Sequence, residues 1–475
     1  MTPSLMSMPL EILLCICSYL PATDYGLLRR ASKHLDSSLF SAFAKRFFHS
    51  RQFMLTESSL RVLVAISKSR LSSFLKELTL GTNRFDPSLS PCLRRRLNHV
   101  QQARYLAESI DQDTLVNTGH DRVLLCEALQ ELAVETIRIK DCDPGSSYGA
   151  TTILNETGAG GVYTHGDAFF NTACLNKLLC ALDNAKSRPN KLEFVFRNGI
   201  LDSAFHIPSY MNGVKAVLAG VQELSLRINS CVSPADAALI IRNAQPPEAD
   251  THLLRRFVGC LSNLRKLSVV PRFRENVFGP DDFMQWLGAP LTAKVEPDAP
   301  TPATFPHLQE LHLNDSTLCS EVLLGLITKF KPTLHTLNLE FVIISDFPHR
   351  HAKDLDLPMP NLWSSFLRNL AKSGVQLQSF TVCGAEQYTC SGPGNIIFEE
   401  EKKPENMYKA QTITFKGLDT MDKVKNLASR AFVHVLEDSD EELADEWDDD
   451  IFFDLDDTFD AFPGLDADDF DPFLF

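Results

Sequence analysis

The sequence predicts a mixed α/β protein in three parts: a short helical segment over residues 1–50, an irregular repeat body over residues 51–430, and an acidic tail over residues 431–475. Three observations support this division. Apolar residues recur every four positions near the N-terminus, a Leu-x-x-Leu-x-Leu pattern returns through the body, and acidic and aromatic side chains alternate near the C-terminus. The first pattern is typical of helices and the second of short strands.

The N-terminal segment is predicted to form two short amphipathic helices. Pro9 suits the first turn of the first helix, Pro21 cannot continue it, and Thr23 or Asp24 can cap the second. A third helix is expected through Phe43, Phe47 and Phe48. A segment of about 40 residues rarely buries enough surface to be stable alone, so we expect it to lean on another surface. Apolar residues recur every four positions in two series: Ile12, Ile16 and Leu20, and then Leu27, Ala31 and Leu35.

The same segment carries Met8-Pro9-Leu10-Glu11-Ile12, then Tyr19-Leu20-Pro21, then Leu27-Leu28-Arg29 and Ser32-Lys33. In these residues and their spacing it resembles the F-box, although Gly26 and Arg30 depart from the family pattern. Residues 53–82 continue the resemblance, to fungal F-box proteins. F-box helices dock on a Skp-type adaptor that ties them to a cullin-RING ubiquitin ligase. The alternative is a helical hairpin inside the core of an enzyme. The adaptor-binding residues that the resemblance implies are Pro9, Leu10, Ile12, Ile16, Leu20, Leu27, Leu28, Ala31 and Leu35.

The body repeats a pattern that resembles the leucine-rich repeat, L-x-x-L-x-L-x-x-N/C-x-L. Its cleanest copy runs from Leu75 to Phe85 with Asn83 at the turn position, where a polar side chain can satisfy backbone groups in the bend. A helical stripe, Val322 to Phe330, precedes one copy. Such units cannot bury an apolar face singly, so parallel strands and helices should stack into an irregular solenoid. The alternative is a generic α/β domain. Copies start at Leu75, Val134, Val221, Leu264, Leu308, Leu334 and Leu377, with a further one near Leu192.

Composition narrows the class of protein. The chain of 475 residues is 44 % apolar, so it can bury a large core, and it has no apolar run near the roughly 18 residues that span a bilayer. Its N-terminus lacks the basic leader of a signal peptide. Twelve cysteines occur without a C-x-x-C pair, which favours reduced thiols inside the cell. We therefore expect an intracellular protein, cytoplasmic or nuclear, that does not bind a membrane.

The net charge of −15 belongs to the tail. Residues 437–475 hold 18 acidic side chains and no Lys or Arg, which leaves 46 basic against 43 acidic residues in the rest of the chain. A nearly neutral body argues against nucleic-acid binding, and the triplet Arg94-Arg95-Arg96 is more typical of a solvated helix face. The tail also carries eight aromatic residues, from Trp447 to Phe475, and is expected to be disordered. It is an inert tail, a motif for a basic partner, or a lid on the chain's own basic surface.

Catalytic motifs are missing from the sequence. The glycines from Gly158 to Gly161 do not fit a phosphate-binding loop, and His349-Arg350-His351 is too loosely arranged for a tetrahedral metal site. No cofactor or metal is expected. The resemblance therefore implies a non-catalytic substrate receptor of a ubiquitin ligase that binds an unidentified client protein. Two alternatives stay open: an F-box-like interaction scaffold without a role in ubiquitination, and an enzyme with an uncharted site.

Overall fold

A computed structural model gives the structure of the chain. The contacts of the described residues divide the chain into two units: unit 1 comprises Met1–Asn198 and Pro208–Val217, and unit 2 comprises Gly199–Ile207 and the described residues from Leu218 to Val435. Both are mixed α/β with a largely parallel sheet, which confirms the predicted fold class at that level. The structure describes residues 5, 8–85, 91–141, 147–158, 168–228, 231–232, 252–271, 282–290, 300–346, 359–389, 392–398 and 411–435.

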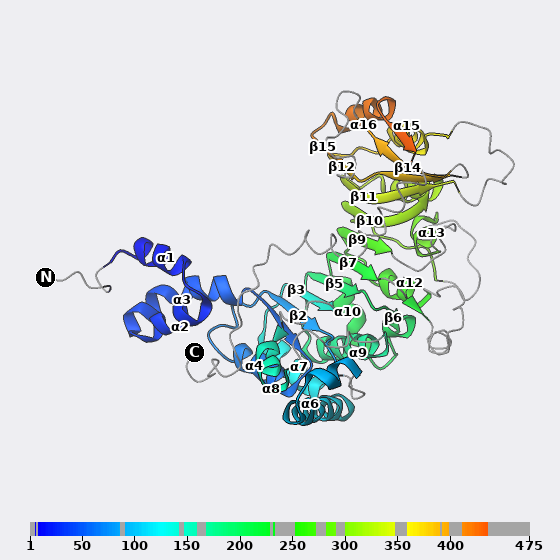
Figure 1. The fold of residues 1–475 in the computed structure, drawn as a ribbon. Helices are drawn as coiled ribbons and strands as arrows, with labels where there is room; N and C mark the ends of the chain where they lie inside the picture. The colour runs from blue at the N-terminus through cyan, green and yellow to red at the C-terminus, as the bar shows by residue number, and fades with distance from the viewer. Residues whose placement is uncertain are drawn as a thin grey trace. The chain divides into compact units, whose positions relative to one another are not determined.

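Unit 1 begins with three helices and continues into a parallel sheet of order β4-β1-β2-β3-β5 (Figure 1). Its helices are α1 (Leu10–Ser18), α2 (Ala22–Arg30), α3 (Lys33–Phe48), α4 (Glu57–Ser67), α5 (Pro91–Arg96), α6 (His99–Thr118), α7 (His120–Glu131), α8 (Ala150–Thr157) and α9 (Ala168–Ala185). Its strands are β1 (Ser50–Met54), β2 (Glu77–Gly81), β3 (Thr136–Lys140), β4 (Ser147–Tyr148) and β5 (Lys191–Phe196).

Unit 2 repeats the strand-then-helix order. Strands β7, β9, β10 and β11 are parallel neighbours, and β11 also pairs in parallel with β12 and β13 (Figure 1). Pairing turns antiparallel at β12–β15, β13–β14 and β14–β16. The elements after β5 are α10 (Asn212–Gly220), β6 (Ile200–Leu201), η3 (Asp202–Phe205), β7 (Glu223–Ile228), β8 (Cys231–Val232), α12 (His252–Gly259), β9 (Lys266–Pro271), α13 (Asp282–Gly288), β10 (Glu310–Cys319), α14 (Ser320–Phe330), β11 (Thr336–Ser345), α15 (Leu362–Lys372), β12 (Ser379–Cys383), β13 (Glu386–Thr389), β14 (Gly392–Ile397), β15 (Thr412–Lys416), α16 (Thr420–Ser429) and β16 (Phe432–Val435).

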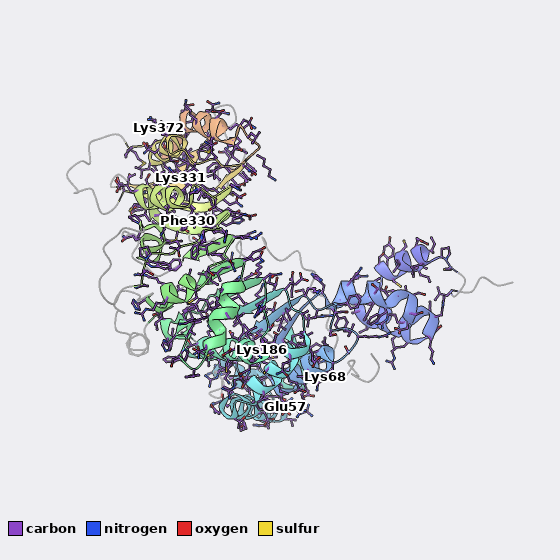
Figure 2. The ribbon with its side chains drawn as sticks, turned by 180° about the vertical axis from the view of Figure 1, so that it is seen from behind. Glu57, Lys68, Lys186, Phe330, Lys331 and Lys372 are labelled. Carbon is purple, nitrogen blue, oxygen red and sulfur yellow. The ribbon has the colours of Figure 1, made fainter. Side chains whose placement is uncertain are left out.

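The repeated leucines form the core of both units. In unit 2, Leu311 and Leu313 of β10 lie opposite Leu337 and Leu339 of β11, and all four are buried. Alternate residues on each strand point to the other face, so one face of the sheet is apolar and the other polar. Helix α14 contains the apolar stripe, Val322 to Phe330, that the sequence predicted before β11. Phe330 and Lys331 mark its C-terminal end in Figure 2, and a cation there suits the negative end of the helix dipole.

In unit 1 the backbone of one bend is hydrogen-bonded by a buried carboxylate, that of Asp141, and not by the predicted Asn83. Asp141 follows β3 and accepts the N–H groups of Arg197 (2.9 Å) and Asn198 (2.7 Å) after β5. Asn83 is fully buried, but its Oδ1 accepts the hydroxyl of Ser147 (3.4 Å) instead of a backbone group. In the repeat copy that starts at Val134, the N/C position is Cys142, and this residue lies outside the described residues. Burial raises the pKa of Asp141, while these hydrogen bonds lower it.

The predicted C-terminal tail starts with a strand. Residues Phe432–Val435 form β16 and pair antiparallel with β14, so the sheet extends into the range assigned to the tail. Residues 436–475, including every acidic and aromatic residue on which the tail prediction rests, lie outside the described residues.

Candidate functional site

Helix α1 begins directly after a proline. Pro9 is extended (φ −56°, ψ 148°) and is the N-cap residue, one position before the first turn, where the sequence predicted it. Proline suits a helix N-terminus because the N–H that it lacks would find no partner there. At the other end, Nη1 of Arg46 from α3 donates to the carbonyl of Cys17 (2.9 Å). One of the last carbonyls of α1 is thereby satisfied by a cation.

Helix α2 starts earlier than predicted. Pro21 itself is the N-cap residue (φ −64°, ψ 166°), and Ala22 is the first helical residue. The prediction that Thr23 or Asp24 caps this helix was wrong, because the extended backbone of the proline places both polar residues inside the first turn. Asp24 still lies near the positive end of the helix dipole.

Helix α3 is the third helix that the sequence predicted. Ser32 precedes it in extended conformation (φ −160°, ψ 141°), and its hydroxyl oxygen accepts the N–H of His34 (3.2 Å). The break at Ser32 gives α3 its own apolar stripe with a four-residue step. The buried members of that stripe are Leu35, Leu39, Phe43 and Phe47.

The three helices pack around one tyrosine. The Tyr25 ring makes edge-to-face contacts with Phe43 (centroids 5.3 Å apart) and Phe47 (5.9 Å). Leu13 and Cys17 of α1 are 3 % and 1 % exposed and complete this core. Burial, together with the neighbouring Cys17, raises the pKa of Tyr25 to about 12, so the phenol is neutral in the folded chain.

A three-residue ion network ties the helices to the rest of unit 1. Asp36 accepts from Nη2 of Arg29 (2.6 Å) and from Nη2 of Arg70 (2.6 Å), which follows α4. The Arg29 side chain is only 3 % exposed and lies over the Phe43 ring at 4.2 Å. Burial raises the pKa of Asp36, but the hydrogen bonds from Arg70 and Arg29 outweigh it and hold that pKa below 3.8.

The outer side of α1 and α2 is apolar and uncovered by any described residue. Ile12, Ile16 and Tyr19 are 50 %, 38 % and 83 % exposed and follow the i, i+4, i+7 spacing of one helix face. Leu27 of α2 is 60 % exposed. A helix that is apolar on all sides is normally buried on all sides, so α1 still has one face available for a partner. We call these four residues the α1–α2 face.

The nine sequence-predicted residues divide by burial. The exposed ones are Pro9, Leu10, Ile12, Ile16, Leu27 and Ala31. Leu20 and Leu28 are half-buried. Leu35 is 3 % exposed and lies in the core, because it belongs to the stripe of α3 and not to that of α2. Tyr19, part of the resemblance but absent from the predicted set, is the most exposed large side chain of α1.

A second surface is the polar face of the sheet in unit 2. Lys266, Glu310 and Thr336 are paired in register on β9, β10 and β11, with Ser268, His312 and Asn338 two positions further on. Glu310 lies 3.5 Å from the Lys266 ammonium and 3.4 Å from His312 Nε2. Burial and Lys266 lower the pKa of His312, and Glu310 opposes them. This face offers donors and acceptors to a ligand, and its charges are partly paired already.

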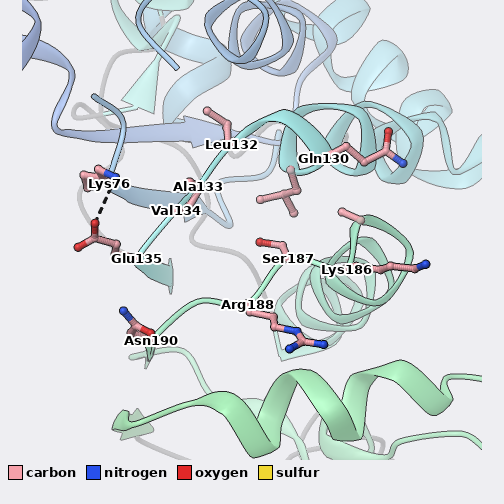
Figure 3. A pocket seen from close by; sticks show the side chains of 12 residues that line it. Lys76, Gln130, Leu132, Ala133, Val134, Glu135, Lys186, Ser187, Arg188 and Asn190 are labelled. Atoms are coloured by element: carbon pink, nitrogen blue, oxygen red, sulfur yellow. Dashed lines mark ion pairs between the residues drawn. The ribbon is translucent and has the colours of Figure 1, made fainter. Parts of the chain in front are cut away.

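A pocket of about 390 Å³ lies in unit 1 where β3 and β5 begin (Figure 3). Its one carboxylate, Glu135, forms an ion pair with Lys76 (3.2 Å). Lys186 and Arg188 add exposed cations on the opposite side. No acid–base pair or nucleophile with a neighbouring base lines it. The lining residues are Lys76, Leu129, Gln130, Leu132, Ala133, Val134, Glu135, Ala185, Lys186, Ser187, Arg188 and Asn190.

The described part of the chain holds neither a metal-binding cluster nor a membrane-spanning helix. No three His, Cys, Asp or Glu side chains there are placed to hold a metal ion, and no helix there has the length and hydropathy to cross a membrane. His349 and His351 lie outside the described residues, as do Gly160 and Gly161. Comparisons with models of known protein families and with curated proteins found no match to this chain.

Proposed function

We propose that the chain is an F-box substrate receptor of a cullin-RING ubiquitin ligase, with a degenerate leucine-rich-repeat body, acting in the cytoplasm or nucleus. The observation that carries the proposal is the uncovered α1–α2 face. Three of its four residues, Ile12, Ile16 and Leu27, belong to the set that the F-box resemblance implies, and the other sides of the two helices are packed. Leu35 is left out of the proposed surface because it is buried.

The adaptor would complete the core that three short helices leave open. Burying a large aliphatic side chain contributes roughly 1.5 to 3 kcal/mol, so Ile12, Ile16 and Leu27 together supply several kcal/mol of binding free energy. The ion network of Arg29, Asp36 and Arg70 holds α2 against α3 and so presents the face in one arrangement before binding. Preorganisation of this kind reduces the entropic cost of association.

The polar sheet face of unit 2 is the surface that we propose for the client protein. Polar and charged side chains on adjacent parallel strands, such as Glu310, His312 and Asn338, form an array that a folded partner can hydrogen-bond. The receptor itself supplies no reacting group in this proposal. It holds the client near the ubiquitin-charged conjugating enzyme, which turns a bimolecular encounter into an effectively intramolecular one.

The decisive experiment measures adaptor binding by calorimetry with the full chain and a fungal Skp-type adaptor. The double variant Ile12→Asp/Ile16→Lys places each charge at the helix end whose dipole favours it, so α1 should remain folded. We expect at least about a 100-fold loss of affinity, equivalent to two buried aliphatics. Undiminished binding by this variant rules out the proposed surface.

A matched control introduces the same two charges at aliphatic residues elsewhere that are more exposed than Ile12 and Ile16. Val123 of α7 is 56 % exposed and Leu418, before α16, is 97 % exposed. The variant Val123→Asp/Leu418→Lys should bind the adaptor within about twofold of the unmodified chain, since exposed sites away from an interface contribute little. Equal losses in both variants would show that charge or general destabilisation, and not the face, is being measured.

Two alternatives to this function remain separable. An interaction scaffold would bind the adaptor through the same face without directing degradation, so a ubiquitinated client should not accumulate in cells treated with a proteasome inhibitor. A receptor should accumulate one, and only with an intact α1–α2 face. An enzyme would show turnover that the Ile12→Asp/Ile16→Lys change leaves intact.

A further inference from the structure

A second apolar face lies on helix α6 of unit 1. Val100, Leu106 and Ile110 are 66 %, 39 % and 65 % exposed, and Ala103 and Ala107 between them are exposed too. These positions share one side of the helix. The other side is packed: its buried residues are Tyr105, Ser109, Gln112 and Leu115. Helix α6 therefore has one face fixed in its unit and one face that no described residue covers.

Positive charge surrounds the first half of that face. Arg94, Arg95 and Arg96 at the end of α5 are exposed, and none of their guanidinium groups forms an ion pair or hydrogen bond within the described part of the chain. The Gln102 amide of α6 donates to the carbonyl of Arg94 (2.8 Å) and to that of Leu97 (2.8 Å), which holds the arginine triplet beside the first turn of α6.

The charge changes sign along α6. From residue 91 to residue 107 the chain has four arginines, the fourth being the exposed Arg104, and no acidic residue. Glu108 and Asp111 follow. Burial and the nearby Asp111 and Glu156 raise the pKa of Glu108, so further negative charge is unfavourable at this end. An acidic ligand should therefore lie over α5 and the first half of α6. We call this region, with Val100, Leu106 and Ile110, the α5–α6 face.

The C-terminal segment of the chain has the complementary chemistry. Residues 437–475 contain 18 carboxylates, no Lys or Arg, and eight aromatic residues spread from Trp447 to Phe475. The last described residue is Val435, and 40 residues follow it. Fully extended, they reach on the order of 130 Å. Covalent attachment keeps the segment at millimolar effective concentration near surfaces within its reach.

The alternative apolar surface carries less positive charge than the α5–α6 face. Glu11 and Asp24 lie near the four residues of the α1–α2 face, and the exposed cations Arg30 and Lys33 follow only at and after the end of α2. Like charges across an interface disfavour association, whereas complementary charges select the partner. The acidic segment should accordingly favour the α5–α6 face, since residues 91–107 have four arginines and no acidic residue.

We propose that residues 437–475 bind the α5–α6 face of their own chain, with carboxylates against Arg94, Arg95, Arg96 and Arg104 and aromatic rings over Val100, Leu106 and Ile110. The contact is independent of adaptor binding. It closes an apolar face that would otherwise promote association with other proteins, and it weakens as ionic strength rises, because salt shortens the range of the charge attraction.

The test uses photo-crosslinking in the full chain. A benzophenone amino acid replaces Phe459, and mass spectrometry maps the cross-linked peptides. We expect intramolecular cross-links to the peptide that contains Val100 and Ile110. In the triple variant Arg94→Glu/Arg95→Glu/Arg96→Glu the yield should fall on the order of tenfold, since three attractive pairs become repulsive. A similar fall is expected in about 1 M salt, where the Debye length is about 3 Å.

A charge-matched control separates this contact from a general effect of net charge. Lys331 and Lys372 (Figure 2) and Lys425 are exposed cations of unit 2. The variant Lys331→Glu/Lys372→Glu/Lys425→Glu changes net charge equally and should leave the cross-link yield unchanged. The variant Val100→Ser/Ile110→Ser should lower the yield without altering the melting temperature, because both side chains are already exposed.

Three outcomes would overturn the proposal. Cross-links to α1 or α2 would place the segment on the other apolar face. Cross-links only between isotope-labelled and unlabelled copies would identify a second copy as the occupant. An absence of cross-links would show that residues 437–475 do not bind the α5–α6 face of their own chain.

Discussion

Two helices of unit 1, α1 and α6, each combine a packed face with an exposed apolar one, and they differ in the charge around the exposed face. Ile12, Ile16 and Tyr19 lie in a stretch with two acidic residues and no basic one. Val100 and Leu106 lie in a stretch, residues 91–107, with four arginines and no acidic residue. Apolar exposure marks both as docking surfaces, and only the charge around each indicates which kind of partner it accepts.

The two faces also differ in what holds them. Helix α1 rests on a small core centred on Tyr25 and Phe43, whereas the packed side of α6 contacts a separate cluster of Phe85, Tyr105 and Met54 that includes a strand of the sheet. Each face should therefore lose its own partner when either its exposed residues or the core beneath it is disrupted.

The largest effect is expected from Phe43→Ala. The ring is fully buried and contacts Tyr25 and Phe47, and truncating such a side chain costs about 3 to 5 kcal/mol. Hydrogen exchange followed by mass spectrometry should show α1 and α2 opening more than about 100-fold more often, with little change at α6. Adaptor binding should fall with the loss of α1.

The reciprocal variant is Phe85→Ala. Phe85 is 1 % exposed and packs edge-to-face on Tyr105 with ring centroids 5.3 Å apart. Exchange should now accelerate in α6 and not in α1. If either change loosens both helices equally, the two faces share one cooperative core, and the contrast between them is wrong.

The helices show where sequence periodicity was informative and where it failed. The four-residue step predicted helices in the N-terminal segment, and the structure has three, α1, α2 and α3. The step could not select the packed side of α1, because Leu13 and Cys17 are as apolar as Ile12 and Ile16, and the core takes only the first pair. The four-residue step also assigned Leu35 to the same stripe as Leu27 and Ala31. The extended backbone at Ser32 ends that series, and Leu35 belongs to the next helix, α3.

The body was more predictable because a strand has only two faces. The repeated Leu-x-Leu pairs, such as Leu311-x-Leu313, lie on parallel strands with both leucines buried. The buried Asp141 was missed. Its role depends on the N–H groups of Arg197 and Asn198, more than 50 residues away, and no local pattern reveals such a partner. The α5–α6 face was missed for a similar reason, since Arg94 to Arg96 gain meaning only beside Val100.

A smaller effect is expected from Asp36→Asn. The change leaves the nearly buried Arg29 without its carboxylate partner, and hydrogen bonds to charged groups contribute about 1.5 to 3 kcal/mol. Because the pKa of Asp36 is depressed in the folded chain, the carboxylate stabilises the fold above its unfolded pKa of about 3.9. That contribution is lost as the pH falls through the folded pKa. Denaturant unfolding should show a large difference between variant and unmodified chain at pH 7 that shrinks below about pH 4.

The matched control for this prediction lies on the other face. Asp111 of α6 is exposed and forms no ion pair within the described residues. Asp111→Asn should change the free energy of unfolding by less than about 0.5 kcal/mol, as surface substitutions usually do. A loss as large as that of Asp36→Asn would mean that the ion network of α2 and α3 has no special role in presenting the α1–α2 face.

The smallest effect, a gain in stability, is expected from Glu108→Gln. Burial, Asp111 and Glu156 raise the pKa of Glu108, so its ionised form costs stability above the folded pKa, and that cost disappears as the pH falls below the unfolded value. At pH 7 the variant should be more stable than the unmodified chain by up to about 0.5 kcal/mol of unfolding free energy. The urea midpoint should rise, and the dependence of the unfolding free energy on urea concentration should stay the same. In a chain that already carries Asp111→Asn the gain should shrink, because one source of repulsion is gone. A gain that persists at about pH 3 would show that packing, and not charge, distinguishes the second half of α6. The polarity that directs the acidic segment towards the arginines would then lose its support.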